Sequence, residues 1–170
     1  MNKYALIAAL GPDAVDAVHG YRVAVLAEAE RRWLCLAAEA APLDAAVAPR
    51  GFAGIEAIDI RLAFVYCRGR PDLAGRTLQW GPEQGWSMSH RLANRPLCYY
   101  ARSVTEAPQL VPSPPELLDW AVAEPSGGAY PPATGRFDNN ADAIKRLLRF
   151  VDPVHGFPSG VVSDRTHVEE

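Results

Sequence analysis

The stretch Arg76-Thr-Leu-Gln-Trp-Gly-Pro-Glu-Gln-Gly-Trp86 decides the fold, because it places two tryptophans on either side of a glycine-proline turn. Glycine and proline are typical turn residues, and apolar side chains alternate with polar ones on both sides of them. The pattern predicts a β-hairpin whose strands run over residues 77–80 and 86–92. We expect Trp80 and Trp86 to pack across the hairpin and hold it together, rather than to bind a ligand.

Other strand-like runs flank this hairpin. Upstream, residues 58–66 alternate strictly, with Asp59 and Arg61 on the polar face. Downstream, residues 97–102 predict a further strand, and the short apolar run over residues 33–38 predicts a buried one. Five consecutive strands with short joins predict an antiparallel meander. Two apolar faces follow from the alternation: Ile58, Ile60, Leu62, Phe64 and Tyr66 in one strand, and Trp86, Met88, His90 and Leu92 in another.

Helical patterns precede and follow the strands. Gly11-Pro-Asp13 is a typical helix start, and an apolar stripe follows it until Arg31 and Arg32, which suit a C-terminal end. Ser113-Pro-Pro-Glu116 is a capping box that predicts the start of a second helix. A third helix is predicted within residues 138–152 from a further apolar stripe. The members of that stripe are Ile144, Leu147, Leu148 and Val151.

The predicted fold class is α+β, with an antiparallel meander sheet of about five strands packed by an N-terminal helix and two C-terminal helices. Dense glycine and proline in residues 125–137 predict a linker. We therefore divide the chain into an α+β domain over residues 1–124, this linker, an additional amphipathic helix over residues 138–152 and a polar tail over residues 153–170.

Composition restricts the class of protein and its partners. The chain has 170 residues, of which 49% are hydrophobic and 22% charged, so it can bury a core of its own. A net charge of -3 argues against a general nucleic-acid binder. No run approaches the roughly 18 apolar residues that span a bilayer, so no membrane partner is expected. Residues 1–10 are too short for a secretory signal and predict a structured segment.

The three cysteines indicate the cellular compartment. Cys35, Cys67 and Cys98 are odd in number, lie far apart and stand in apolar runs, where reduced cysteine behaves as a small hydrophobic residue. A cytoplasmic, reducing location is expected.

Three segments together resemble a known family. They are Gly20-Tyr-Arg-Val-Ala-Val-Leu-Ala-Glu-Ala29, Gly75 to Trp86, and Pro112-Ser-Pro114 before a helix. They resemble the uncharacterised actinobacterial domain-of-unknown-function family 6292, over roughly residues 14–123. The resemblance implies an actinobacterial cytoplasmic protein with a small α+β domain, and it implies no activity and no catalytic residue.

The middle segment carries most of the resemblance and also the clearest departures from it. The family pattern looks like Gly-Arg-Asp-Leu-x-Leu-x-Trp-Asp-Glu-x-x-Gly-Trp, whereas this chain has Thr77 in place of the first aspartate and Gly81-Pro82 in place of Asp-Glu. If those acidic residues serve a shared function, this chain has lost or changed it.

Most familiar chemistries lack their residues here. The glycines of residues 51–54 lead into a strand and not into a helix, so they do not form a phosphate-binding loop. The cysteines are about 30 residues apart and no paired zinc-ligand spacing exists, so no metal is expected. His90 and Cys98 stand on neighbouring predicted strands, but a core thiol near a half-exposed histidine explains them better than a nucleophile does. No cofactor is expected.

Acid–base chemistry needs only a few polar groups that converge in an apolar pocket. The candidate catalytic residues stand on strands that can share a sheet face: Asp59, Arg61, His90, Tyr99 and Tyr100. The ordinary interpretation is a solvated cross-strand set with wet tyrosine hydroxyls.

The absence of a recognisable catalytic set favours a non-catalytic accessory or regulatory module that binds a protein or a small ligand. The alternative is a small enzyme of specialised metabolism, which performs acid–base cyclisation or isomerisation in an apolar pocket. A homodimer through the terminal helix is a third hypothesis.

Overall fold

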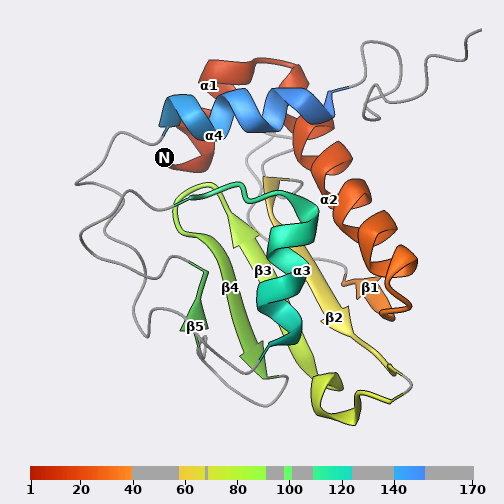
Figure 1. Cartoon of the computed structure of the whole chain (residues 1–170). Helices are drawn as coiled ribbons and strands as arrows, with labels where there is room; N and C mark the ends of the chain where they lie inside the picture. The colour runs from red at the N-terminus through yellow and green to blue at the C-terminus, as the bar shows by residue number, and fades with distance from the viewer. Residues whose placement is uncertain (40–57, 68, 91–97, 101–108, 124–139, 152–170) are drawn as a thin grey trace, which may run out of the picture.

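Five strands form one antiparallel sheet whose order follows the chain, β1-β2-β3-β4-β5 (Figure 1). They are β1 (Leu36–Ala38), β2 (Ile60–Phe64), β3 (Arg76–Gly81), β4 (Gly85–His90) and β5 (Cys98–Tyr99). The predicted meander and the α+β class are confirmed. This computed structural model describes residues 1–39, 58–67, 69–90, 98–100, 109–123 and 140–151.

Helices pack on one face of this sheet and across one of its ends. In Figure 1, α2 and α3 lie against the sheet, while α1 and α4 run beside each other near the turn between β3 and β4. Their bounds are α1 (Lys3–Leu10), α2 (Asp13–Arg31), α3 (Pro114–Val122) and α4 (Asn140–Leu147), with short 3-10 turns η2 (Pro71–Leu73) and η4 (Leu148–Phe150). The starts predicted for α2 and α3 are confirmed, and Ser113 and Glu116 form the predicted capping box.

The core lies between the sheet and these helices. The apolar stripe predicted for α2 is buried throughout, and so are the inward residues of α3 and of the three central strands. Burying one such side chain contributes about 1.5–3 kcal/mol. The main contributors are Ala14, Val18, Tyr21 and Val25 from α2, Leu117, Leu118 and Trp120 from α3, and Ile60, Leu62, Phe64, Leu78, Trp80, Trp86 and Met88 from the sheet.

Tyr21 connects the two hairpin tryptophans inside this core. Trp80 and Trp86 are partners across the hairpin and are 2% and 0% exposed. Their ring centroids lie 6.2 and 6.0 Å from that of Tyr21, in edge-on geometry. The indole N–H of Trp86 donates to the Tyr21 hydroxyl at 2.9 Å, and that of Trp80 donates to the Leu110 carbonyl at 2.8 Å. Both tryptophans are therefore structural, as the sequence predicts.

The turn of the hairpin depends on Gly85. Its φ of 68° lies in the left-handed region, which glycine adopts without strain. A Cβ at this position would also lie 3.3 Å from the backbone of Leu110. The turn therefore packs directly against the segment that leads into α3.

The prediction that residues 33–38 form a buried strand is wrong in two respects. Only Leu36–Ala38 pair with β2, and β1 is an edge strand whose Ala37 and Ala38 are exposed. Trp33 is 90% exposed and has a φ of 59°. The reason is the exit from α2, because the amide of Trp33 donates to the Glu30 carbonyl and that of Leu34 to the Ala29 carbonyl. These two bonds form a Schellman motif, which requires a left-handed residue at the position of Trp33.

Two other apolar residues lie outside the predicted faces. Tyr66 is 67% exposed, because β2 ends at Phe64 and the alternation ends with it. Leu148 is 46% exposed, because the helix tightens to a 3-10 turn at that residue and shifts the buried side. In α4 itself, Ala143 and Leu147 are the buried residues.

Several predictions fall on residues outside the described part. They concern the linker over residues 125–137, the tail over residues 153–170 and Leu92. The strand predicted over residues 97–102 is described only at residues 98–100, where Cys98 and Tyr99 pair with β4. Among the described helices, none has the length and apolar character needed to cross a bilayer.

Candidate functional site

Four polar side chains form a straight row across the sheet face that points away from α2 and α3. The strand register pairs Arg61 with Gln79, Gln79 with Ser87, and Ser87 with Tyr99. Alternation places all four on one face, because Leu62, Leu78, Trp86 and Met88 beside them face the core. The outer face of the central strands is therefore built from polar side chains.

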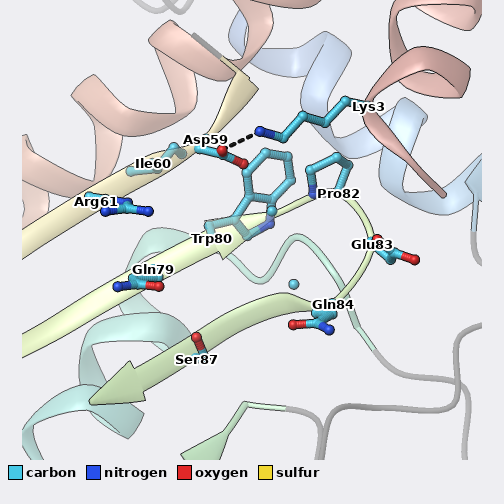
Figure 2. Close-up of a pocket in the computed structure, with 12 residues that line it drawn as sticks. Lys3, Asp59, Ile60, Arg61, Gln79, Trp80, Pro82, Glu83, Gln84 and Ser87 are labelled. Atoms are coloured by element: carbon cyan, nitrogen blue, oxygen red, sulfur yellow. Dashed lines mark hydrogen bonds and ion pairs between the residues drawn. The ribbon is translucent and has the colours of Figure 1, made fainter. Parts of the chain in front are cut away.

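Three members of this row line a pocket of about 280 Å³. Arg61, Gln79 and Ser87 stand in line along it, and the β3–β4 turn closes one side (Figure 2). Ser87 is buried although its side chain is polar, so it forms part of the floor. Gly81 has no side chain to fill the space between the turn and Asp59. The residues that line the pocket are Lys3, Asp59, Ile60, Arg61, Gln79, Trp80, Gly81, Pro82, Glu83, Gln84, Gly85 and Ser87.

An ion pair forms one wall of this pocket. The Lys3 ammonium in α1 donates to the Asp59 carboxylate just before β2 (Figure 2). Both side chains are about one-third exposed, 32% each. A Cβ on Gly81 would lie 3.5 Å from the Asp59 carboxylate oxygen, so the glycine leaves the carboxylate room against the strand. The N-terminal helix thus contributes a residue to a site that otherwise belongs to the sheet.

The polar groups of the row are available to a ligand. No hydrogen bond or ion pair joins the side chains of Arg61, Gln79 or Ser87 to another described residue. Each of them carries strong hydrogen-bonding groups: the guanidinium has five N–H donors, and the amide and the hydroxyl can both donate and accept. A small polar molecule in the pocket would meet a cation, an amide and a hydroxyl in sequence.

The structure brings together some of the sequence-predicted candidates. Asp59 and Arg61 both line the pocket. Tyr99 stands on the same sheet face, at the end of the row beyond Ser87, and is buried. These three residues share a face, as expected.

His90 and Tyr100 do not share that face, and the expectation that all five candidates do so is wrong for them. His90 pairs with Arg76, whose guanidinium donates to the carbonyls of Ala121 and Ala123 at the end of α3. Tyr100 packs edge-on against Trp120 of α3, with ring centroids 5.5 Å apart. Both residues therefore stand on the helix side. The reason is the period of two, which sends adjacent residues such as Tyr99 and Tyr100 to opposite faces.

The cysteine alternative finds no support in the geometry. The partner of Cys98 in β4 is Met88, so His90 is offset by two residues from the position opposite the thiol. Burial raises the pKa of the Cys98 thiol, which disfavours the reactive thiolate. Cys67 is also buried, and its sulfur accepts a hydrogen bond from the backbone amide of Cys35 at 3.3 Å. Within the described ranges, no three histidine, cysteine or acidic side chains converge in a way that could hold a metal ion.

Sequence reasoning missed Lys3, Gln79 and Ser87. The sequence does contain a signal for Gln79 and Ser87, because the turn over residues 81–85 sets a register that puts these two residues opposite each other. The sequence contains no such signal for Lys3, since its place in the pocket depends on how α1 packs over the end of the sheet.

The chain matches no protein-family model, no curated protein and no solved structure. The resemblance to domain-of-unknown-function family 6292 therefore stays a prediction.

Proposed function

We propose that this protein is a non-catalytic accessory or regulatory module that binds a small polar molecule in the pocket on the outer face of its sheet. The observation that carries the proposal is the row of Arg61, Gln79 and Ser87, three polar side chains that line one pocket and bind no other described side chain. Ligand sites typically combine a concave surface with a few polar groups of fixed position. Three adjacent strands hold these groups at fixed spacing.

The charges in the pocket favour binding over acid–base catalysis. The Asp59 carboxylate is paired with the Lys3 ammonium, and Arg61 contributes a guanidinium cation. A general acid or base needs a proton that it can exchange near the working pH, which histidine most often supplies. His90 stands at the end of β3–β4 opposite the turn, about 10 Å along the strand from Ser87, and it faces the helix side of the sheet. The alternative hypothesis, a small acid–base enzyme, requires an apolar pocket that contains a group able to exchange a proton near the working pH.

The same observations favour a small ligand over a protein partner. The outer face is hollowed at the row, and its polar groups point into the hollow (Figure 2). The homodimer hypothesis rests on the apolar stripe of the terminal helix, of which Leu147 is buried inside the monomer and Leu148 is 46% exposed. Self-association through the terminal helix stays a prediction, and the mass of the protein in solution tests it.

The experiment is an NMR screen of the ¹⁵N-labelled protein against a library of small polar metabolites. We expect binders to shift the amides of Arg61, Gln79, Gly81 and Ser87. Gly81→Val adds a side chain beside Asp59 and should remove these shifts. Ala37→Val is the matched control, because Ala37 is an exposed small residue of β1 outside the pocket.

Two results would overturn the proposal. One is a screen in which no compound shifts the pocket amides, or in which Gly81→Val binds as the wild type does. The other is turnover of a substrate by the purified protein that Asp59→Asn abolishes while the circular dichroism spectrum stays unchanged.

A further inference from the structure

We infer that the ligand of this pocket is a small organic carboxylate that carries at least one further hydroxyl or carbonyl group; the inference rests on the proposed function. It begins with the ionisable residues that line the pocket, Lys3, Asp59, Arg61 and Glu83. Lys3 and Asp59 neutralise each other. The Glu83 side chain is exposed at the turn and points away from the row (Figure 2). Arg61 is thus the one cation of the pocket without an ionic partner among the described residues, and the other unpaired group, Glu83, lies at the turn away from the row (Figure 2).

A single guanidinium at the wall of a pocket selects for an anion. Its planar fork of N–H donors matches a carboxylate, with which it forms two parallel hydrogen bonds. Arg61 is held for this role by the strand, because its backbone carbonyl accepts a bond from the amide of Glu39 and its neighbours Ile60 and Leu62 are anchored in the core. A ligand carboxylate therefore meets a fixed backbone and an unpaired head group.

The same pocket is poorly suited to a phosphate. Phosphate sites usually combine several cations with backbone N–H groups at a helix N-terminus or in a glycine-rich nest. Here the second cation, Lys3, is occupied by Asp59, and the lining comes from strands and a hairpin turn, with α1 contributing only Lys3. The single unpaired cation beside the row, Arg61, balances one negative charge and not two.

Gln79 and Ser87, the other two pocket residues of the row, indicate which groups the ligand carries next to its carboxylate. Neighbouring strands are about 4.8 Å apart, so the row from Arg61 to Ser87 spans about 10 Å. Gln79, at the centre, offers an amide, and Ser87, at the floor, offers a hydroxyl. Hydroxyl or carbonyl groups along the ligand would satisfy both of them. A chain of about five or six heavy atoms after the carboxylate reaches that distance.

The test uses ligands that differ only at the charged end. D-gluconate, D-sorbitol and D-sorbitol 1-phosphate share one six-carbon polyhydroxy chain, whose C1 end carries a carboxylate, a hydroxyl and a phosphate, respectively. They form one triplet in a library built from such carboxylate, alcohol and phosphate sets. Binding is measured by titration of the Gln79 and Ser87 amides in NMR spectra. We expect the pocket binders to be carboxylates, each at least tenfold tighter than its alcohol and phosphate counterparts.

Two substitutions test how much the charge of Arg61 contributes to ligand binding. Arg61→Gln should weaken carboxylate binding at least tenfold and should remove the preference for a carboxylate over its matched alcohol. Arg149→Gln, at an exposed arginine of η4, is the matched control and should change neither. Added salt should weaken carboxylate binding and should leave the binding of the uncharged alcohols unchanged.

The outcomes distinguish the inference from the proposed function. Alcohols or phosphates that bind at the pocket amides as tightly as the carboxylates would contradict the ligand class and leave the binding function in place. A library in which no member shifts those amides would contradict both.

Discussion

The indole N–H of Trp86 donates a hydrogen bond to the hydroxyl of Tyr21 at 2.9 Å, across 65 residues of sequence. The same hydroxyl donates to the carbonyl of Pro112 at 2.7 Å. One buried side chain of α2 therefore joins the hairpin to the segment that leads into α3. The two bonds give a hydrogen-bond partner to every polar atom involved, so the connection leaves no buried polar group unpaired.

Removing this hydroxyl should destabilise the protein. Tyr21→Phe leaves the Trp86 indole N–H and the Pro112 carbonyl buried without their partner. We expect the free energy of unfolding to fall by about 2–4 kcal/mol, measured by urea denaturation. Tyr66→Phe, at an exposed tyrosine, is the control and should stay within about 0.5 kcal/mol of the wild type. A loss below about 1 kcal/mol in Tyr21→Phe would show that water replaces the hydroxyl.

The same tyrosine should make stability depend on alkaline pH. Burial raises the pKa of Tyr21, so its proton is held in the folded state. In the unfolded chain the group ionises near its ordinary pKa of about 10. A raised folded-state pKa gives stability that is fully present below about pH 10 and declines above it, by up to about 1.4 kcal/mol per pH unit.

The measurement is denaturation of wild type and Tyr21→Phe at several pH values between about 8 and about 11. The stability difference between the two proteins should be constant at the lower pH values and shrink above about pH 10. A difference that stays constant over the whole range would mean that Tyr21 ionises equally in both states.

Trp33→Gly should stabilise the protein. Trp33 occupies the left-handed position of a Schellman motif, where glycine is the usual residue, and its side chain is 90% exposed. Relief of the backbone strain exceeds the extra entropy of glycine in the unfolded chain, so we expect a gain of about 0.5–1 kcal/mol in chemical denaturation. Trp33→Ala keeps the strain and should change little. If Trp33→Ala destabilises the protein strongly, the ring makes contacts that its exposure does not indicate.

Gly85→Ala should destabilise the protein for two reasons that a control separates. The substitution forces a side chain into the left-handed region and brings its Cβ to 3.3 Å from the Leu110 backbone. At Gly69, φ is also positive, at 81°, but a Cβ would meet nothing within 4 Å. Gly69→Ala should therefore lose about 1 kcal/mol, and Gly85→Ala about 2–3 kcal/mol, in thermal or urea unfolding. Equal losses would mean that Leu110 moves aside without cost.

Local patterns in the sequence predicted the central elements well, because each of them has a clear physical signature. The capping box of Ser113 and Glu116 marks the start of α3, and the glycine-proline turn marks the hairpin. The strict alternation from Ile58 to Phe64 marks β2. Predictions were weaker where an element ends, as at Tyr66 and Leu148, because the end of a strand or helix depends on what it packs against.

The site was only partly predictable. Asp59 and Arg61 were candidates because their strand alternates so clearly, and both line the pocket. His90 and Tyr100 do not share the face of these two, and the alternation already groups His90 with Trp86 and Met88. Strand pairing confirms this grouping, since the register that sets Arg76 opposite His90 turns that histidine toward the helix side.

The sequence by itself determined the order of the strands, the hairpin at its centre and the helix that carries Tyr21, because these follow from periodicity, turn residues and capping groups over a few neighbouring positions. Only the tertiary structure decided that Arg61, Gln79 and Ser87 form one row, and that Lys3 reaches Asp59 at its edge. The physical reason is that a pocket forms where distant segments meet. Their meeting depends on the registers of three strands and on the packing of α1, which no local pattern encodes.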